Sequence, residues 1–195
     1  ESARQIATNQ TVNPGQIGTV ILPNSITYVE HFLASMMGGW VFNPLPYFTQ
    51  TQELERILAY IEPTALLTDR EDVMSAFSRD NRVIKPVQLL SHSGEYEDKK
   101  IEPDQPAALY YSSGTIGNPK GVLYSHKNMV SLISSIVRGF RFLKDDRQLA
   151  FLPFGHTASI NYNILPALLV GYDLYISPPR PHAATRHANP ALGPG

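Results

Sequence analysis

The 195-residue chain contains no cysteine, which excludes disulfide bridges, thiolate metal sites and a cysteine nucleophile. It has no apolar run approaching the roughly 20 residues that a membrane-spanning helix requires. Neither sign of charge is in excess, because 16 Lys and Arg stand against 17 Asp and Glu, for a formal net charge of −1. This balance gives no global electrostatic case for a nucleic-acid partner or an acidic membrane surface. The chain opens at Glu1 with no signal-peptide pattern, so its compartment cannot be read from this end.

Apolar residues make up 43% of the chain and charged residues 17%, a composition that supports a buried core rather than intrinsic disorder. The length predicts one domain, with room for a piece of another. Short apolar runs alternate with segments of helical periodicity, and no internal repeat is present. This alternation predicts an α/β fold in which helices flank a mostly parallel sheet.

The element boundaries follow from apolar runs, turn residues and helix-start signals. We predict strands at residues 19–22, 41–43, 65–68, 87–90, 107–111, 148–152 and 173–176. Helices are predicted at residues 27–37, 50–61, 69–78, 126–138 and 160–169, and a polar loop at residues 92–106. Capping-box spacing occurs at Thr27 with Glu30 and at Thr49 with Gln52, and Gly38–Gly39 supply a helix stop. Ser125 or His126 is expected to cap the helix that begins there.

The segment from Ser177 to Gly195 differs from the rest, because it holds five of the sixteen prolines and a single large aliphatic residue, Leu192. It cannot bury enough apolar surface to order itself. We therefore expect one domain over residues 1–176 and a disordered tail over residues 177–195. An ordinary flexible tail and a truncation with an unrelated ending both remain open.

The most informative segment lies between a predicted strand and a predicted helix, and it reads Tyr110-Tyr111-Ser112-Ser113-Gly114-Thr115-Ile116-Gly117-Asn118-Pro119-Lys120-Gly121. Its glycines allow close backbone approach to a ligand, and exposed backbone N–H groups in such a turn bind anions. The hydroxyl groups add donors, Lys120 adds a charge suited to phosphate, and a following helix N-terminus would favour an anion further. A plain Gly/Ser-rich connecting loop is the alternative at this point.

Other known motifs do not fit. The segment is neither the Walker-type loop, which requires Gly-Lys-Ser/Thr, nor the dinucleotide pattern Gly-x-Gly-x-x-Gly. The chain also lacks the Gly-x-Ser-x-Gly elbow of serine hydrolases.

Residues Tyr111–Gly121 resemble the phosphate-binding signature of the acyl-adenylate-forming superfamily, Tyr-(Ser/Thr)-Ser-Gly-(Thr/Ser)-Thr-Gly-x-Pro-Lys-Gly. This superfamily includes acyl-CoA synthetases, 4-coumarate–CoA ligases, beetle luciferases and the adenylation domains of peptide synthetases. The match has one departure, Ile116 in place of Thr. Both flanks, residues 103–109 and 125–128, resemble those of the family as well.

Two further stretches are similar to family segments. Residues 15–41, centred on Leu22-Pro23-Asn24-Ser25, resemble the first strand–helix unit, and Leu152–His156 resembles the Leu-Pro-x-x-His segment that brings a histidine to the acyl pocket. The resemblance covers residues 1–176. It implies part of the large N-terminal subdomain, well under half of a typical member.

The resemblance implies roles for individual residues. The β- and γ-phosphates of ATP would be held at Ser112, Ser113, Gly114, Thr115, Ile116, Gly117 and Lys120. At Ile116 a hydroxyl is lost: either a charge-assisted hydrogen bond worth about 1.5–3 kcal/mol is missing, or the position tolerates the change. His156 would orient the carboxylate or donate to it during adenylation, and no residue is predicted to ligate a metal directly. Phe154, Asn161 and Tyr162 would either line the acyl pocket or simply pack.

The implied reaction joins a small-molecule carboxylic acid to coenzyme A through an acyl-adenylate, with ATP as co-substrate and Mg²⁺ assisting the phosphoryl chemistry. Medium-chain, long-chain and aryl acids are all open, and the cytoplasm and the peroxisome are the expected compartments. The chain contains no aromatic-Gly-x-Thr-Glu segment, no later ribose-binding Asp motif, and no C-terminal subdomain with its catalytic Lys.

Three hypotheses follow. In the first, the chain is an N-terminal piece of an acyl-CoA synthetase-like ligase and is inactive alone. In the second, it is a non-catalytic module that binds a nucleotide or a partner. In the third, it is an incomplete product whose exposed sheet edge and apolar patches promote association. We expect a missing C-terminal half or a partner to cover the exposed face.

Overall fold

The computed structural model describes residues 1–8, 12–77, 82–85, 96–112 and 120–178. The strand predicted at residues 87–90 and the tail beyond residue 178 lie outside these ranges. Within residues 96–105 there is no helix or strand, as the predicted loop requires.

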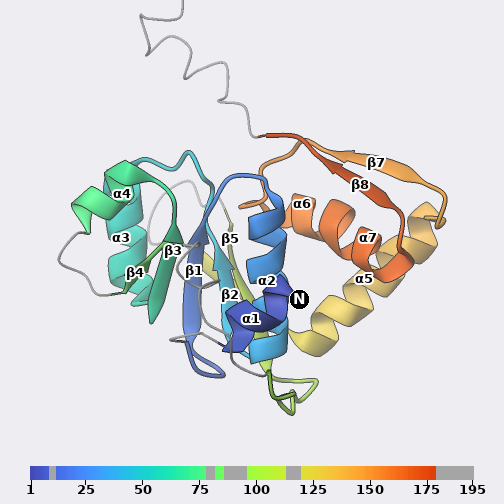
Figure 1. Cartoon of the computed structure of the whole chain (residues 1–195), viewed down its shortest axis with the longest axis horizontal. Coiled ribbons are helices and arrows are strands. Elements are labelled where there is room, and N and C mark those ends of the chain that lie inside the picture. Colours follow the sequence, from blue (N-terminus) through green and yellow to red (C-terminus); the bar gives the residue numbers. More distant parts are fainter. Residues whose placement is uncertain (9–11, 78–81, 86–95, 113–119, 179–195) are drawn as a thin grey trace, which may run out of the picture.

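A six-stranded sheet forms the centre of the fold (Figure 1). Its order is β4-β3-β1-β2-β5-β6, with every neighbouring pair parallel except β5 and β6. The strands are β1 (Ile17–Ile21), β2 (Val41–Pro44), β3 (Ala65–Thr68), β4 (Val83–Ile84), β5 (Pro106–Ser112) and β6 (Lys120–Ser125). The predicted α/β class with a mostly parallel sheet is confirmed.

Helices pack on both faces of this sheet. They are α1 (Ser2–Thr8), α2 (Ile26–Gly38), α3 (Thr51–Ile61), α4 (Glu71–Ala76) and α5 (His126–Phe140). Successive strand residues point to opposite faces, so Val20 joins one buried cluster with α1 and α2, while Ile21 joins another with α3 and α4. The helix α1 was not predicted, because only Ile6 and Ala7 of its seven residues are buried.

A smaller unit lies at the opposite end of the molecule from α3 and α4 (Figure 1). It consists of a parallel pair, β7 (Arg147–Ala150) and β8 (Asp173–Ile176), and the helical segment that joins the two strands. That segment runs as α6 (Thr157–Ser159), a π-helical stretch η2 (Ile160–Ile164) and α7 (Leu165–Val170). The helix predicted over residues 160–169 is therefore present, but it begins three residues earlier and contains a π-helical stretch.

Helix ends test the capping predictions. The side chain of Ser25, not Thr27, caps α2, and Gln50 precedes α3 without a side-chain cap, so both predicted capping boxes there are wrong. At Gly39 a left-handed conformation (φ 72°) ends α2, as predicted. Ser125 forms a true capping box with Asn128 at α5, while His126 is the first helical residue.

The largest correction concerns the end of the segment Tyr110–Gly121, which we call the phosphate-type segment. The sequence predicted a loop over residues 112–121 leading to a helix, but Lys120–Ser125 form β6, which pairs antiparallel with β5. Val122, Leu123 and Tyr124 favour a strand once β5 is available as a partner. The segment therefore returns into the sheet, and the argument from a following helix N-terminus is wrong.

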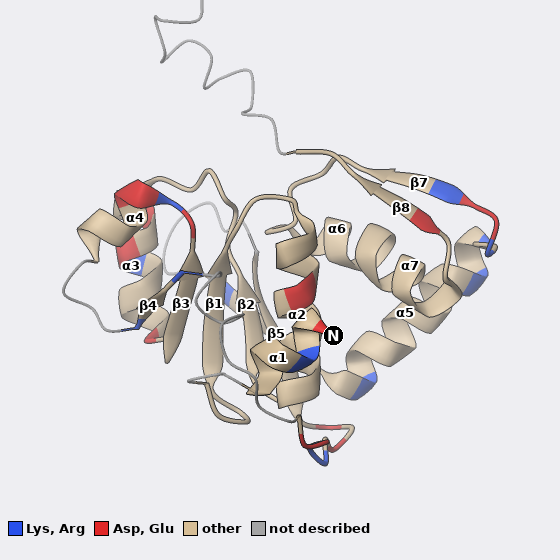
Figure 2. Ribbon diagram, viewed as in Figure 1, with Lys and Arg blue, Asp and Glu red and all other residues tan. Residues whose placement is uncertain are grey.

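Charge is sparse on the large sheet, whose strands carry one Lys and no acid (Figure 2). Among the described residues, no helix is both long and apolar enough to cross a membrane.

The burial of His31 on α2 leads us to predict how the stability of the fold depends on pH. Its side chain is fully buried, Nδ1 lies 2.7 Å from the carbonyl oxygen of Thr27, and burial lowers the pKa of the imidazole. A neutral ring with the proton on Nδ1 satisfies that hydrogen bond. The unfolded chain takes up a proton near pH 6.5 and the folded chain only at lower pH, so stability is lost as pH falls below about 6.5.

We expect the free energy of unfolding to fall between pH 7.5 and pH 5.5, by up to about 1.4 kcal/mol per pH unit for this one proton. His126 contributes in the same direction, since burial lowers its pKa too. The variant His31→Asn retains an amide donor for Thr27 and should show a shallower slope. Urea denaturation at several pH values measures both slopes, and equal slopes would contradict the assignment.

Candidate functional site

The candidate site lies at one edge of the large sheet. Strands β1, β2, β3 and β5 are parallel, so their carboxyl ends share this edge, where ligands of open α/β sheets bind. The phosphate-type segment leaves the sheet here at Ser112, the end of β5, and returns at Lys120, the start of β6. Ser112 and Lys120 are opposite each other in the antiparallel pair, and the Lys120 residue is exposed.

The remaining predicted phosphate-binding residues lie outside the described residues, and their roles stay predictions. They are Ser113, Gly114, Thr115, Ile116 and Gly117. The hairpin nevertheless fixes both ends of the segment that carries them.

His156, the predicted carboxylate-orienting residue, is exposed at the start of α6. Its Nδ1 accepts a hydrogen bond from the backbone N–H of Ala158 at 3.2 Å. In a neutral imidazole that accepts at Nδ1, the proton resides on Nε2. The arrangement therefore leaves an Nε2–H donor available for a ligand.

Two residues of the first strand–helix unit tether the segment before His156. The amide of Asn24 donates to the carbonyl of Leu152 at 2.8 Å and accepts from the backbone N–H of Phe154 at 2.8 Å. The hydroxyl of Tyr28 donates to the carbonyl of Phe154 at 2.6 Å. Asn24 lies within the family-like stretch of residues 15–41, but no role was predicted for either side chain.

Gly155 brings this segment against the end of β2. A Cβ at this position would lie 2.5 Å from the carbonyl oxygen of Leu45 and 2.6 Å from Cα of Pro46. Only glycine permits so close an approach of the two backbones. Because Leu45 and Pro46 directly follow β2, His156 is brought to the same edge of the sheet as Ser112.

The three residues proposed for either packing or the acyl pocket have different surroundings. Phe154 is buried, and its ring contacts that of Tyr28 edge-on at 5.2 Å. Asn161 is 9% exposed, and Tyr162 is 44% exposed with its ring 5.7 Å from Phe140. Packing accounts for Phe154, and the acyl-pocket roles stay predictions.

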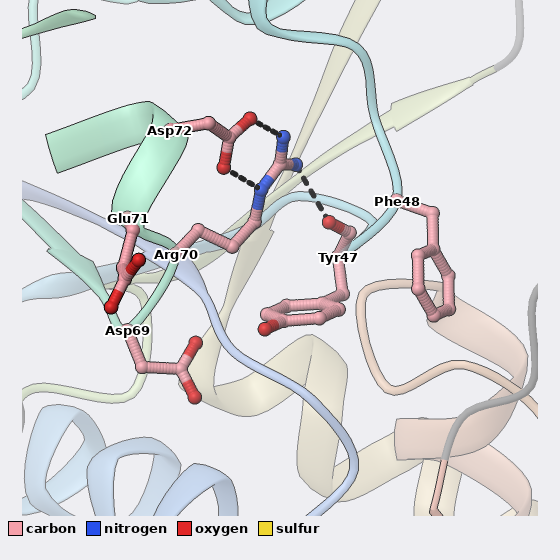
Figure 3. Close-up of a pocket in the computed structure, with 6 residues that line it drawn as sticks. All are labelled: Tyr47, Phe48, Asp69, Arg70, Glu71 and Asp72. Atoms are coloured by element: carbon pink, nitrogen blue, oxygen red, sulfur yellow. Dashed lines mark hydrogen bonds and ion pairs between the residues drawn. The ribbon is translucent and has the colours of Figure 1, made fainter. Parts of the chain in front are cut away.

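An ion-paired arginine stiffens the neighbouring loop at the same edge (Figure 3). The Arg70 guanidinium donates to the carbonyls of Tyr47 at 2.7 Å and Thr49 at 2.6 Å, and it also binds both carboxylate oxygens of Asp72. Asp72 in turn accepts from the hydroxyl of Thr51 at 2.7 Å. These contacts join the loop after β2 to the start of α4. No sequence pattern predicted them.

The arginine cluster lines an open pocket of about 690 Å³, formed by Tyr47, Phe48 and residues 69–72. The hydrogen bond from Arg70 holds the pKa of Asp72 well below its usual range. Burial raises the pKa of the Tyr47 phenol, and the Asp69 carboxylate raises it further. Since Arg70 already binds backbone carbonyls and Asp72, the cluster acts as a structural clamp for the loop that supports Gly155.

No group of three or more His, Asp or Glu able to hold a metal ion occurs in the part of the chain that the structure describes.

Comparison with known proteins identifies the family. The sequence profile of the AMP-binding enzyme family matches residues 3–190. The chain is 31% identical to 4-coumarate–CoA ligase 1 of Arabidopsis thaliana, over 90% of its own length and 37% of that protein's. It is 30% identical to the sulfoacetate–CoA ligase of Cupriavidus necator, over 80% of its length and 34% of the relative's. It spans about a third of these curated relatives.

Solved structures agree on the fold. The o-succinylbenzoate CoA synthetase (MenE) of Bacillus subtilis superposes with a TM-score of 0.81 at 22% identity, covering 96% of this chain and 40% of that one. The N-terminal subdomain of Klebsiella oxytoca NpsA gives a TM-score of 0.77 at 24% identity, covering 96% and 48%. Because the family profile matches nearly its whole length, the chain belongs to the AMP-binding enzyme family.

Proposed function

We propose that the chain forms part of an ATP-dependent ligase that activates a carboxylic acid as an acyl-adenylate and transfers the acyl group to coenzyme A. The observation that carries this proposal is the convergence, at one sheet edge, of the two ends of the phosphate-type segment and the exposed His156. Membership of the AMP-binding enzyme family supports it. The names of relatives that ligate 4-coumarate and sulfoacetate to coenzyme A support it as well.

In this proposal each residue has a defined task. Lys120 offers an ammonium group to the β- and γ-phosphates, and the glycines and hydroxyl residues of 112–117 supply preorganised donors. His156 donates from Nε2–H to the acid's carboxylate and so orients it toward the α-phosphate. The attack forms a carboxylate–phosphate bond and expels pyrophosphate, and coenzyme A then displaces AMP.

Magnesium would accompany ATP and neutralise charge on its phosphates.

We further propose that these 195 residues alone do not turn over. The downstream glutamate, ribose-binding aspartate and catalytic lysine motifs are absent from the sequence. Acid-dependent ATP–pyrophosphate exchange should stay at the blank with 4-coumarate, sulfoacetate and fatty acids of medium and long chain. Robust exchange by the chain would contradict this part.

Lys120 provides the binding test. Replacing it with alanine should weaken ATP binding roughly 10- to 150-fold, since a charge-assisted contact is worth about 1.5–3 kcal/mol. The matched control is Lys127→Ala, because Lys127 is exposed on α5 and lies 3.9 Å from Asp104. Titration calorimetry with ATP measures all three proteins. Equal loss in both variants, or no ATP binding by the parent chain, would count against the proposal.

A second candidate is a nucleotide-binding module without catalysis, which Ile116 favours because it lacks the family's hydroxyl. An antibody against residues 110–121 distinguishes the two on a blot of the native source. A band two to three times the length of this chain supports the ligase, and its exchange activity can then be assayed. A band at 21.7 kDa supports the module.

A further inference from the structure

Two polar side chains are buried among apolar residues in the middle of the large sheet. Thr19 of β1 and Asn43 of β2 are register partners, and both are 0% exposed. Two residues further along the same strands, Ile21 and Leu45 belong to the apolar cluster formed with α3 and α4. Burying an amide in such surroundings is costly unless it is hydrogen-bonded. The hydrogen bonds of Asn43 therefore show which parts of the fold it holds.

The amide of Asn43 contacts the strands on both sides of β2. Its Oδ1 accepts a hydrogen bond from the hydroxyl of Thr19 on β1 at 2.8 Å. Its Nδ2 donates to the backbone carbonyl of Leu109 on β5 at 2.8 Å. Because β2 lies between β1 and β5 in the sheet, this one side chain joins three neighbouring strands.

The direction of the backbone groups in β2 follows from its hydrogen bonds on the side of β1. The N–H groups of Val41 and Leu45 donate to carbonyls of β1 and of the residue before it, at 2.8 and 3.0 Å. Successive N–H groups along a strand point to opposite sides, so the backbone nitrogens of residues 42 and 44 point toward β5. Residue 44 is proline, which has no N–H. The carboxyl end of β2 thus lacks a backbone donor toward β5.

The register shows which acceptor loses its backbone partner. Phe42 is paired with Ala108, so residue 43 is level with Leu109. In a parallel ladder with this register, the Leu109 carbonyl would accept from the backbone nitrogen of residue 44. The Nδ2 of the neighbouring asparagine donates to this carbonyl instead. The side chain therefore replaces the ladder bond that Pro44 cannot make.

We propose that Asn43 is a positioning residue that fixes the spacing between the phosphate-type segment and His156, an inference that rests on the proposed function. The bond to Leu109 holds β5 beside β2 just before Ser112, where the segment leaves the sheet. The chain that directly follows β2 packs against Gly155, next to the histidine. Asn43 thus connects the strand that supports His156 with the strand that carries the phosphate-type segment.

Three variants test this role. Asn43→Leu is similar in shape and removes both hydrogen bonds. Thr19→Val is the matched control, because it removes the bond to Oδ1 and leaves the bond from Nδ2 to Leu109 in place. The double variant Asn43→Leu with Pro44→Ala restores an N–H at residue 44, and with it a backbone donor for the Leu109 carbonyl. A role of Asn43 in packing alone would not be rescued in this way.

Amide hydrogen exchange followed by NMR reports on the end of β5 without any ligand. Relative to residues 65–68 of β3, residues 109–112 should exchange about 3- to 10-fold faster in Asn43→Leu than in Thr19→Val, the effect of one net hydrogen bond. The double variant should exchange like Thr19→Val. Equal exchange in the two single variants, or no recovery in the double variant, would overturn the proposal.

ATP binding, measured by titration calorimetry, should follow the same order. Asn43→Leu should bind ATP about 3- to 10-fold more weakly than Thr19→Val, and the double variant should match Thr19→Val. A loosened β5 with unchanged ATP affinity would overturn the positioning role. If the parent chain does not bind ATP, the proposed function fails, while the exchange rates still decide whether Asn43 holds the end of β5. Circular dichroism checks folding, and Asn43→Ala replaces Asn43→Leu if the latter does not fold.

Discussion

Gly155→Ala should lower the free energy of unfolding by about 1–3 kcal/mol, the typical cost of forcing extra atoms into a packed site. Its Cβ would lie 2.5 Å from the Leu45 carbonyl oxygen and 2.6 Å from Cα of Pro46. Both are backbone atoms and cannot move aside as a flexible side chain would. The segment bearing His156 would have to shift away from β2 instead.

The control for this substitution is Gly139→Ala in α5. An added Cβ there meets nothing within 4 Å, and glycine inside a helix is less stable than alanine by about 0.5–1 kcal/mol. This variant should therefore gain stability. Urea denaturation followed by fluorescence of the single, buried tryptophan, Trp40, reports both. Equal midpoints for Gly155→Ala and the parent would show that the close approach has no energetic weight.

Asn24→Ala should destabilise the chain by about 2–4 kcal/mol. The amide makes two hydrogen bonds, to the carbonyl of Leu152 and from the backbone N–H of Phe154. Asn24 is only 7% exposed and Phe154 1%, so little water can replace the lost acceptor. A buried donor left unsatisfied costs about 1–3 kcal/mol by itself.

Asn13→Ala supplies the comparison, because Asn13 is exposed in the loop before β1 and should change stability by no more than about 0.5 kcal/mol. The same denaturation experiment applies. A double variant with Tyr28→Phe should lose less than the sum of its parts, since Asn24 and Tyr28 both hold Phe154. Strict additivity would mean that the two tethers act independently.

Sequence patterns correctly predicted the elements that depend only on residues close together in the sequence. The run at residues 65–68 is buried throughout and forms β3, and the strand predicted at residues 173–176 has the bounds of β8. Ser125 caps α5 as expected. The predictions that failed depend on partners distant in the sequence or on competition among nearby caps. For β6 the deciding factor is the pairing of residues 120–125 with β5, and Ser25 competes with Thr27 for the start of α2.

The candidate site likewise contains residues that sequence motifs indicated and residues that they did not. Family-like motifs indicated His156 and the segment from Ser112 to Lys120, and the structure fixes both ends of that segment at the edge where His156 lies. Asn24, Tyr28 and Gly155 had no recognisable signal for their tethering roles, because their partners are backbone atoms of distant segments. Arg70 likewise binds the carbonyls of residues 47 and 49. Because every residue has a backbone carbonyl, the sequence does not indicate which of them will accept a hydrogen bond.

The tether from Asn24 to Phe154 spans 130 residues of sequence, which has a consequence for the order of folding. During synthesis at about 5–20 residues per second, Asn24 waits on the order of 10 s before its partner leaves the ribosome. Strands β1, β2 and β3 can assemble in that interval, but His156 cannot reach the sheet edge. Contacts of such long range also slow folding. The histidine of the candidate site is thus expected to take its place only after β1, β2 and β3 have been synthesised.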